Sequence, residues 1–435
     1  MFQQKRIDVI SLGCSKNLID SERLLKRLKL KGYDTFHDSE KPCGEYVVVN
    51  TCGFIADAKE ESINIILSLA DSKKKGKIGS LVVMGCLSQR YLEDLKKEIP
   101  EVDIWYGKYD WKDFIDKLPD RCEKYKKPLS WERHLTTPPH SAYIKISEGC
   151  DRHCAFCAIP MITGKYKSRE IDEILDETRY LASQGVKEFN VIAQDLSSYG
   201  KDLYGRHSLA TLIDKMSDIL GVEWIRLHYA YPADFPEDIL DVMSKKDNVC
   251  KYLDIALQHI SDPVLKNMKR RITKDETLAL LDKIRAKVPG IKIRTTLMTG
   301  FPGENEEAFE ELIDFVKTQR FDRMGAFAYS EEDDTLAAKT LTDNISDETK
   351  QKRLDNLMEI QQEIALELNE EMIGTVQKVL IDRIDDGVAY GRTQYDSPEI
   401  DPEVIIKDNT LSPGQFVKVK ITKAFPFELE GIVWE

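Results

Sequence analysis

The stretch EGCDRHCAFCAIP at residues 148–160 places three cysteines within eight positions. Three residues separate Cys150 from Cys154, and two separate Cys154 from Cys157. A structural zinc site usually has four ligands in two pairs, whereas a four-iron cluster held by three thiolates leaves one iron open to an external ligand. The triplet therefore favours a 4Fe–4S cluster, with zinc and a redox dithiol as the alternatives.

The residues around this triplet, about 143–335, alternate between strand and helix patterns. Six short apolar segments predict strands: AYIKIS (142–147), EFNVIA (188–193), WIRLHYA (224–230), YLDIALQ (252–258), IKIRTTLMT (291–299) and RMGAFAYS (323–330). Most are separated by helical patterns, such as 170–184 and 273–288. Six such units predict a partial (β/α)6 barrel, related to the eightfold barrel, whose chemistry lies at the C-terminal ends of the strands. The triplet directly follows the first strand and so lies at that end.

The first segment, residues 1–118, predicts a different α/β fold. Short β-branched runs at 7–12, 46–50 and 80–84 are each followed by a helical pattern. Such strands are typical of an open parallel sheet that helices cover on both faces.

Three more cysteines, Cys14, Cys52 and Cys86, each lie one or two residues beyond one of these strands. In an open α/β sheet such positions gather at the carboxyl edge, where ligands bind. Each has a neighbouring glycine that lets the backbone approach closely: Gly13, Gly53 and Gly85. Three buried structural cysteines are the alternative, since a free cysteine packs as a small hydrophobe. We expect a shared metal site.

Three further parts complete the predicted organisation. Residues 119–142 are rich in Pro and Lys and lack periodicity, which is typical of a linker. Residues 336–371 contain a predicted connecting helix at 346–369, capped by Ser346. In 372–435 the pattern changes to short β segments, which predict a small closed β-barrel.

Composition narrows the classes of protein. No apolar run approaches the ~18 residues of a membrane span, and the N-terminus lacks the features of a signal peptide, so we expect a soluble cytoplasmic protein. In that reducing compartment, nine cysteines favour metal binding or catalysis over disulfides. The net charge of −13 does not favour nonspecific binding to a phosphate backbone.

The CxxxCxxC spacing, with the aromatic Phe156 before the last cysteine, resembles the radical S-adenosylmethionine (SAM) superfamily. The resemblance implies that the amino and carboxylate groups of SAM chelate the open iron, and that Phe156 belongs to the cofactor site. It also implies that an electron from the cluster cleaves SAM into methionine and a 5′-deoxyadenosyl radical.

Other SAM contacts follow from the same resemblance. Gln194 and Asp195 end the second strand, where the superfamily often has a Gly-Gly-Glu stretch that receives the methionine amino group. Gly300 and Gly303, in TGFPGE after the fifth strand, are expected to approach the adenosine, and Arg294 is a candidate partner for the SAM carboxylate.

Alternatives stay open for two of these strand ends. TGFPGE could instead be an ordinary helix N-terminus with Glu304 in the first turn. His259, at the end of the fourth strand, is expected to hydrogen-bond neighbouring loops rather than to act in catalysis. No side chain is assigned a catalytic role.

The whole chain, in domain order and motifs, resembles the methylthiotransferases, which are radical SAM enzymes with a C-terminal barrel of the TRAM type. The resemblance implies two 4Fe–4S clusters, the auxiliary one held by Cys14, Cys52 and Cys86. The family converts a C–H bond into C–SCH3, using one SAM as methyl donor and a second as radical source. An electron donor is therefore an expected partner.

The substrate is a separate question. SLGCSKNLIDSE (11–22) resembles the branch that modifies a ribosomal protein aspartate. Residues 372–435 contain seven Lys and Arg against eleven Asp and Glu, with DSPEID (396–401) concentrating that charge; an acidic barrel suits a basic protein better than tRNA. We therefore expect β-methylthiolation of an aspartate on the twelfth small-subunit ribosomal protein. The alternatives are a tRNA adenosine methylthiotransferase and a non-catalytic iron–sulfur scaffold or electron carrier. Thr163 replaces an Arg common in the family, which leaves that residue's role open.

Overall fold

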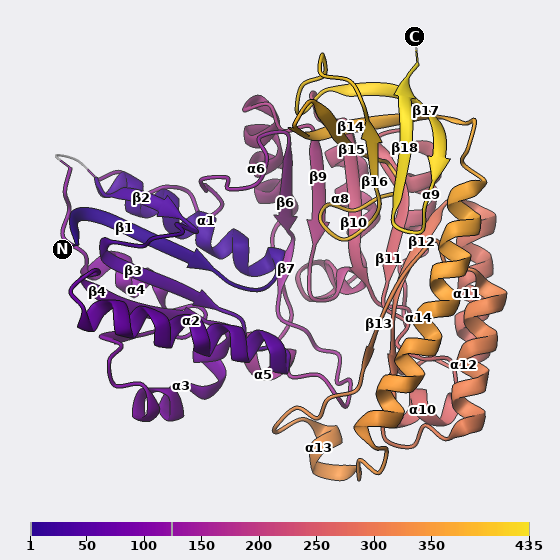
Figure 1. The fold of residues 1–435 in the computed structure, drawn as a ribbon, viewed down its shortest axis with the longest axis horizontal. Coiled ribbons are helices and arrows are strands. Elements are labelled where there is room, and N and C mark those ends of the chain that lie inside the picture. The colour runs from indigo at the N-terminus through magenta and orange to yellow at the C-terminus, as the bar shows by residue number, and fades with distance from the viewer. Residues whose placement is uncertain (1, 123–124, 435) are drawn as a thin grey trace. The chain divides into compact units, whose positions relative to one another are not determined.

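The computed structural model describes residues 2–122 and 125–434, which divide into two compact units (Figure 1). The N-terminal unit contains a five-stranded parallel sheet in the order β2-β1-β3-β4-β5. Its strands are β1 (Gln3–Ser11), β2 (Asp34–His37), β3 (Gly44–Thr51), β4 (Ser80–Gly85) and β5 (Ile104–Trp105). Its helices are α1 (Ser15–Leu30), α2 (Ala56–Lys74), α3 (Cys86–Glu98) and α4 (Trp111–Lys117).

Alternate residues of the central strands pack on opposite faces of this sheet. Val48 and Val82 belong to the core beneath α1 and α4, whereas Val49 and Val83 belong to the core beneath α2 and α3. The structure thus confirms the predicted parallel sheet with both faces covered. Apolar residues on both sides of each strand are what such a sheet requires.

The predicted linker has no helix or strand between α4 and β6 in the described residues, but it is firmly held. Glu22, fully buried on α1, accepts hydrogen bonds from Arg133 Nη1 at 2.5 Å and from the Thr136 N–H at 2.7 Å. Lys31 donates to the Leu118 carbonyl at 2.6 Å. Buried charges therefore fix a segment whose composition predicts a linker.

The second unit contains a six-stranded parallel sheet in the order β13-β12-β11-β10-β9-β6. The strands are β6 (Ser141–Lys145), β9 (Glu188–Ile192), β10 (Trp224–Ala230), β11 (Val249–Ile255), β12 (Lys292–Thr299) and β13 (Arg323–Ala328). The main helices between them are α6 (Ile171–Ser183), α8 (Leu209–Ser217), α9 (Asp238–Lys245), α10 (Asp262–Asn267), α11 (Lys274–Lys287) and α12 (Glu306–Gln319). Sequential parallel strands joined by helices confirm the predicted partial barrel.

Shorter elements lie in the loops of this unit and around the cysteine triplet. They are β7 (Ser147–Glu148), α5 (Ile159–Thr163), β8 (Lys167–Ser168), the 3-10 helix η1 (Leu196–Ser198), α7 (Lys201–Tyr204) and α13 (Leu336–Thr340). None of the described helices combines the length and hydropathy that a membrane span needs.

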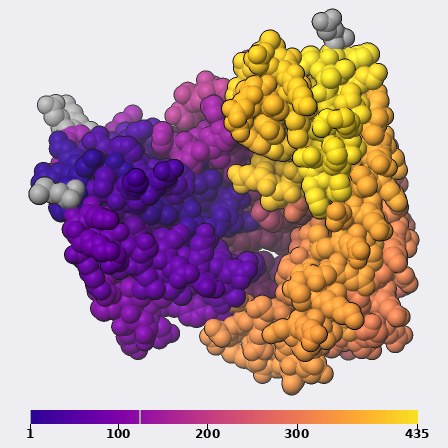
Figure 2. Space-filling view, viewed as in Figure 1, coloured from indigo at the N-terminus to yellow at the C-terminus, as the bar shows by residue number. Residues whose placement is uncertain are grey.

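A long helix and a closed barrel complete the second unit. Helix α14 (Asp347–Glu370) runs beside β13 and begins at the predicted cap, since Ser346 Oγ accepts from the Thr349 N–H. The barrel closes in the order β14-β15-β16-β18-β17. Its strands are β14 (Val376–Asp385), β15 (Val388–Thr393), β16 (Glu403–Ile406), β17 (Phe416–Ala424) and β18 (Glu428–Val433). The barrel lies directly against α14 (Figure 2), where Asn369 donates to the Phe425 carbonyl at 2.8 Å.

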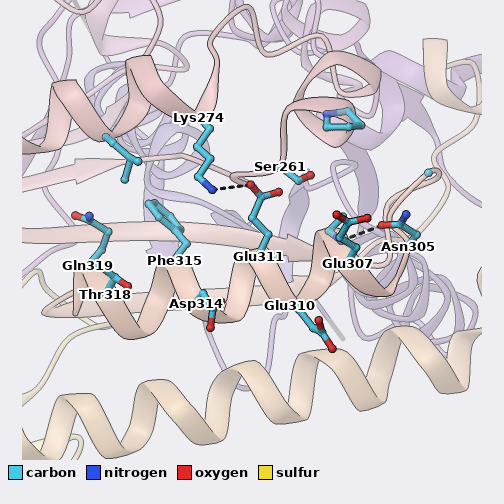
Figure 3. A pocket seen from close by; sticks show the side chains of 14 residues that line it. Ser261, Lys274, Asn305, Glu307, Glu310, Glu311, Asp314, Phe315, Thr318 and Gln319 are labelled. Carbon is cyan, nitrogen blue, oxygen red and sulfur yellow. Dashed lines mark hydrogen bonds and ion pairs between the residues drawn. The ribbon is translucent and has the colours of Figure 1, made fainter.

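A pocket of about 700 Å³ lies among the outer helices of this unit (Figure 3). Its walls come from the start of α10, from α11, and from α12 with the loop that precedes it, and Lys274 and Glu311 form an ion pair of 2.7 Å across it. No cysteine lines this pocket. It therefore belongs to the helical layer and to neither cysteine triplet.

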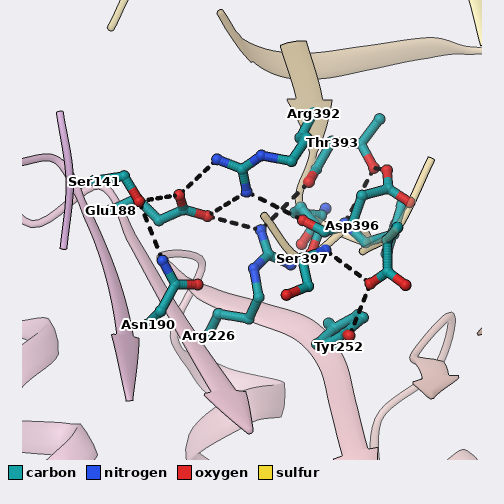
Figure 4. Close-up of polar contacts among 12 residues, drawn as sticks. Ser141, Glu188, Asn190, Arg226, Tyr252, Arg392, Thr393, Asp396 and Ser397 are labelled. Carbon is teal, nitrogen blue, oxygen red and sulfur yellow. Dashed lines mark hydrogen bonds and ion pairs between the residues drawn. The ribbon is translucent and has the colours of Figure 1, made fainter. Parts of the chain in front are cut away.

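The C-terminal barrel is joined to the larger sheet by buried ion pairs (Figure 4). Glu188 of β9 is fully buried and accepts from Arg392 of β15 at 2.9 and 2.7 Å, and from Arg226 of β10 at 3.1 Å. The adjoining loop adds two more pairs: Arg323–Asp396 at 2.7 Å and Arg294–Asp401 at 2.5 Å. We call these residues the seam network: Glu188, Arg226, Arg294, Arg323, Arg392, Asp396 and Asp401.

The seam network corrects two expectations. Asp396 and Asp401 were expected to concentrate charge toward a basic partner, but their side chains are at most 1% exposed and pair with arginines of the sheet. Arg294 was expected near the SAM carboxylate, but it lies near the start of β12, and its guanidinium is bonded to Asp401. In a parallel sheet the starts of the strands lie opposite the edge that carries the chemistry, so Arg294 has a structural role.

Candidate functional site

Cys14, Cys52 and Cys86 follow β1, β3 and β4, which are neighbours in the N-terminal sheet. Cys14 is the N-cap residue of α1, and Cys86 is the first residue of α3. A Cβ atom built on Gly13 would lie 2.7 Å from Cys52 Sγ, and one on Gly53 would lie 2.9 Å from the carbonyl carbon of Cys86. The three segments are therefore packed against one another, at a spacing that only glycine permits.

Buried amide side chains hold these segments together. Asn17 Nδ2 donates to the carbonyls of Leu12 at 2.8 Å and Asn50 at 3.2 Å. Asn50 Nδ2 in turn donates to the Asn17 carbonyl and to Ser21 Oγ. These bonds join the loop that carries Cys14 to the strand that leads to Cys52, so the site is organised by the protein itself.

The three thiols have different electrostatic surroundings. Desolvation alone would raise the pKa of Cys14, which keeps some accessible surface, but Lys16, the Asn17 N–H and Lys108 together lower it. Burial raises the pKa of Cys52, and it raises that of Cys86 to about 11 against the opposing charge of Lys108. Cys14 is thus the thiol best prepared to ionise, as expected beside cations and at a helix N-terminus.

The described residues contain no group of three or more His, Cys, Asp or Glu side chains arranged to hold a single metal ion. A four-iron cluster binds its thiolates at separate irons, so its ligands need not converge on one point. The donor set of three thiols with helix N-termini beside two of them fits such a cluster.

Cys150, Cys154 and Cys157 all lie in the loop between β7 and α5. Gly149 has a φ of +74°, and a Cβ atom there would lie 2.1 Å from the Lys165 carbonyl oxygen, so only glycine fits. The Cys150 N–H donates to the Gly164 carbonyl at 3.2 Å, and the Ala155 N–H donates to the Met268 carbonyl at 2.9 Å. Backbone bonds therefore shape a loop that has no regular structure of its own.

Asp195 contacts this loop rather than facing a free ligand. Its Oδ2 accepts from Arg152 Nε at 2.7 Å and from Ser198 Oγ at 2.6 Å, and its Oδ1 accepts from the Ser197 N–H at 3.0 Å. Both carboxylate oxygens are thus engaged. The structure corrects the expectation that Asp195 receives the methionine amino group: it positions Arg152, which lies between the first two cysteines of the triplet.

Tyr231 and Arg270 surround Cys154, and the sequence reasoning missed both. Arg270 Nη1 lies 3.5 Å from Cys154 Sγ, and the Tyr231 hydroxyl lies 3.7 Å from it. The Tyr231 ring is stacked between the guanidinium groups of Arg270 at 4.1 Å and Arg152 at 4.2 Å. These residues follow different strands, so no local pattern in the sequence indicates that they meet. Together they place positive charge beside a thiol.

Among the buried side-chain oxygens without a hydrogen-bond partner in the part of the chain that the structure describes, Gln194 Oε1 and Gln258 Oε1 lie just beyond β9 and β11. Gln258 also has a φ of +72°, which a residue other than glycine adopts at a cost in energy. An unpaired buried acceptor is costly unless a ligand donates to it. Both atoms therefore fit a cofactor that carries ammonium or hydroxyl groups.

The glycines of TGFPGE have an explanation within the protein. Gly300 and Gly303 have φ values of +72° and +96°, and Cβ atoms there would meet Lys350 Cγ at 2.2 Å and Asn267 Nδ2 at 2.5 Å. Glu304 precedes α12 and accepts from the Gly300 N–H at 3.0 Å. The alternative that Glu304 lies in the first turn of a helix is wrong in detail, because α12 begins only after Asn305, which caps it. An approach of these glycines to adenosine stays a prediction.

The other assigned residues are placed as follows. Phe156 packs edge-to-face on Phe301, with ring centroids 6.1 Å apart. His259 accepts from the Ser261 N–H at 3.0 Å and lies 3.2 Å from Glu304, which confirms that it hydrogen-bonds neighbouring loops. Thr163 Oγ1 donates to the Ile159 carbonyl within α5.

Comparisons with known proteins agree with this architecture. Residues 144–316 match the Radical SAM superfamily, residues 6–107 match the Uncharacterized protein family UPF0004, and residues 373–433 match the TRAM domain. Among solved structures, the radical S-adenosylmethionine methyltransferase TsrM from Kitasatospora setae, with cobalamin and a [4Fe-4S] cluster bound, has a TM-score of 0.56 at 15% identity, over 89% of this chain and 81% of that one. At that identity the likeness shows the fold alone.

Full-length relatives carry a common name, "Ribosomal protein uS12 methylthiotransferase RimO". The protein of Parabacteroides distasonis is 57% identical over 99% of both chains, and that of Bacteroides thetaiotaomicron is 58% identical over 98% of both. That of Cytophaga hutchinsonii is 47% identical over 99% of this chain and 98% of its own.

Fold, cysteine loop and sequence matches thus define a radical SAM protein with a UPF0004 domain at one end and a TRAM domain at the other. Within that class, the chain belongs to the family of ribosomal protein uS12 methylthiotransferases named RimO.

Proposed function

We propose that this chain is a radical SAM methylthiotransferase that adds a methylthio group to the β-carbon of an aspartate on ribosomal protein uS12. The observation that carries the proposal is the pair of cysteine triplets, one on three neighbouring strand ends and one within a single loop, in a chain that matches RimO proteins along its full length. Modification of a ribosomal protein would take place in the cytoplasm.

In this proposal Cys150, Cys154 and Cys157 hold a 4Fe–4S cluster with one iron open to SAM. When bound there, the cluster supplies the electron that cleaves SAM. The protein side of the site supports the assignment: Arg270 donates toward Cys154, and Asp195 fixes Arg152 within the cysteine loop. Hydrogen bonds to the ligating sulfur and nearby charge are recognised means of tuning such a cluster.

The unpaired oxygens supply a place for SAM itself. Gln194 Oε1 is suited to accept from the methionine ammonium group, and Gln258 Oε1 is suited to accept from a second donor of SAM. Phe156 offers an apolar surface beside the cluster loop. Gln194 therefore replaces Asp195 as the proposed receptor of the amino group.

Cys14, Cys52 and Cys86 are the proposed ligands of the auxiliary 4Fe–4S cluster. Three thiols on adjacent strand ends, one of them with a lowered pKa, support this assignment. Three ligands again leave one iron open, as the donation of a sulfur group requires.

The net charge of −13 supports a basic protein as the substrate and does not favour tRNA. Since Asp396 and Asp401 are buried in the seam network, they add nothing to this attraction. An external electron donor completes the proposed set of partners.

The test is to incubate the reduced, reconstituted chain with SAM and either uS12 or tRNA, and to measure product mass. A gain of one methylthio group on a uS12 aspartate is expected, and modification of tRNA alone would refute the substrate. The Cys150→Ala variant should form no 5′-deoxyadenosine while keeping roughly half the iron, since all three proposed ligands of the auxiliary cluster are untouched. A chain that only carries electrons would form no 5′-deoxyadenosine in any variant.

A further inference from the structure

Lys108 is a buried cation at the edge of the N-terminal sheet that carries Cys14, Cys52 and Cys86. Its side chain is 2% exposed, and it lies three residues beyond β5. Its backbone N–H donates to Gln89 Oε1 at 2.9 Å, which attaches it to α3, the helix that begins with Cys86. Burial of an ammonium group is costly unless negative charge compensates it.

The described partner of this ammonium group is Asp20 of α1, whose Oδ2 lies 3.1 Å from Lys108 Nζ. Burial alone would lower the pKa of Lys108, but Asp20, Cys86 and Glu148 raise it well above its usual value. The lysine is therefore charged at neutral pH. It also lies between α1, whose N-cap residue is Cys14, and α3, which begins with Cys86, so its charge is fixed beside two of the three cysteine segments.

We infer that Lys108 is a positioning residue that raises the reduction potential of the auxiliary cluster. The inference rests on the proposed function, because it needs Cys14, Cys52 and Cys86 to hold that cluster. A thiolate-bound cluster becomes more negative when it takes up an electron, and a fixed cation in a water-poor site stabilises that reduced form. The inferred role also explains why a second cation, in addition to the partly buried Lys16, lies at this edge.

The competing explanation is purely structural: the Lys108–Asp20 pair would only tie the loop after β5 to α1. The two explanations predict different directions for the shift in reduction potential. Lys108→Met removes a positive charge near the cluster and Asp20→Asn removes a negative one, although both break the same ion pair. An electrostatic role predicts opposite shifts of the potential, whereas a structural role predicts shifts in the same direction or none.

The experiment uses the full chain with Cys150, Cys154 and Cys157 all replaced by Ala, so that only the auxiliary cluster assembles. Iron and sulfide are counted first, and the cluster is then titrated with reductant while its electron paramagnetic resonance signal is recorded. Lys108→Met should lower the equilibrium constant for reduction about tenfold, which is about 59 mV for one electron. Asp20→Asn should raise this equilibrium constant, and Lys108→Arg should keep it near the value of the chain with Lys108. Lys75→Met, which removes an exposed lysine elsewhere in the same domain, should leave it unchanged.

The outcomes separate the inference from the function on which it rests. Absence of iron in the chain that keeps Lys108 contradicts the proposed auxiliary site. Iron at full content with the same potential in all variants overturns the inference, and so do shifts of one sign in Lys108→Met and Asp20→Asn. If Lys108→Met fails to assemble a cluster, Asp20→Asn decides: a raised potential supports the inference, and an unchanged one overturns it.

Discussion

Arg270 lies beside Cys154, a proposed cluster ligand, but is not itself a proposed ligand. Its guanidinium donates toward Cys154 and stacks on Tyr231. We predict that Arg270→Gln slows 5′-deoxyadenosine formation about 10–100-fold, the usual effect of removing a partner of a metal ligand, and alters the spectrum of the radical SAM cluster. Arg271→Gln, at the exposed neighbouring position, is the control. Equal rates in the two variants would contradict the assigned role.

Gln194 gives a second prediction, for SAM affinity. A hydrogen bond to a charged group contributes about 1.5–3 kcal/mol, so Gln194→Ala should weaken SAM binding by roughly 10–150-fold. Equilibrium dialysis of the reconstituted chain measures this, with iron content checked in the same sample. Gln184→Ala, at an exposed glutamine that ends α6, should bind SAM normally. Unchanged binding by Gln194→Ala would remove Gln194 from the site.

The sequence predicts residues well where their chemistry is local. The spacing of Cys150, Cys154 and Cys157 favours a cluster site already in the sequence, because the three residues share one loop; that they are the ligands stays a prediction. Arg270 and Lys108 could not be predicted, since their partners come from other strands and helices. Arg294 was misassigned for the same reason: its carboxylate partner lies 107 residues further along the chain.

At the scale of elements, strands β9, β10 and β15 meet at Glu188. Removal of one partner of a buried ion pair costs about 3–5 kcal/mol, so Glu188→Ala, which leaves Arg226 and Arg392 without that carboxylate, should lower the stability of this unit by that amount. Urea unfolding followed by tryptophan fluorescence reports it, because Trp224 packs on Phe416 beside the network. Glu223→Ala, which breaks an exposed pair with Lys378, should cost less than about 1 kcal/mol.

The stability that the seam network contributes should fall as the pH is lowered. Burial alone would raise the pKa of Glu188, but Arg392 and Arg226 hold it far below its usual value. A carboxyl whose pKa is lowered by folding stabilises the fold above its unfolded value, roughly 4.3, and this stability is lost as pH falls below that value. Unfolding at pH 3 and pH 7 should therefore differ more in the native chain than in Glu188→Ala. An equal difference would contradict the network's contribution.

Elements with strong patterns were predictable, and short ones were not. The six barrel strands and α14 follow from apolar runs and a serine cap. In contrast, β5 has two residues and α5 has five, which is too short for any periodicity to develop. These elements are formed by the packing of their neighbours.

At the scale of the molecule, the TRAM barrel is expected to be necessary for the stability of the larger sheet. A chain that ends at residue 371 would remove Asp401 and Asp396 from Arg294 and Arg323, and it would uncover Trp224 and Tyr252, which pack against Leu380 of the barrel. We predict that this truncated chain is poorly soluble because of the uncovered aromatic surface, and that replacement of both arginines by Met does not improve its solubility. In the full chain the same replacements should destabilise, because two buried carboxylates lose their partners. Sedimentation of the truncated chain with and without the two replacements tests the first expectation. Unfolding midpoints of the full chain with and without them test the second.

The inward-facing acids of the loop from Thr393 to Asp401 also limit how this enzyme family can be recombined. A chimera that combined this TRAM domain with a foreign sheet would bring Asp396 and Asp401 without Arg323 and Arg294 to pair with them. Grafts are therefore expected to fold only when both halves of the seam network are transplanted together, so the barrel is not an independently exchangeable domain.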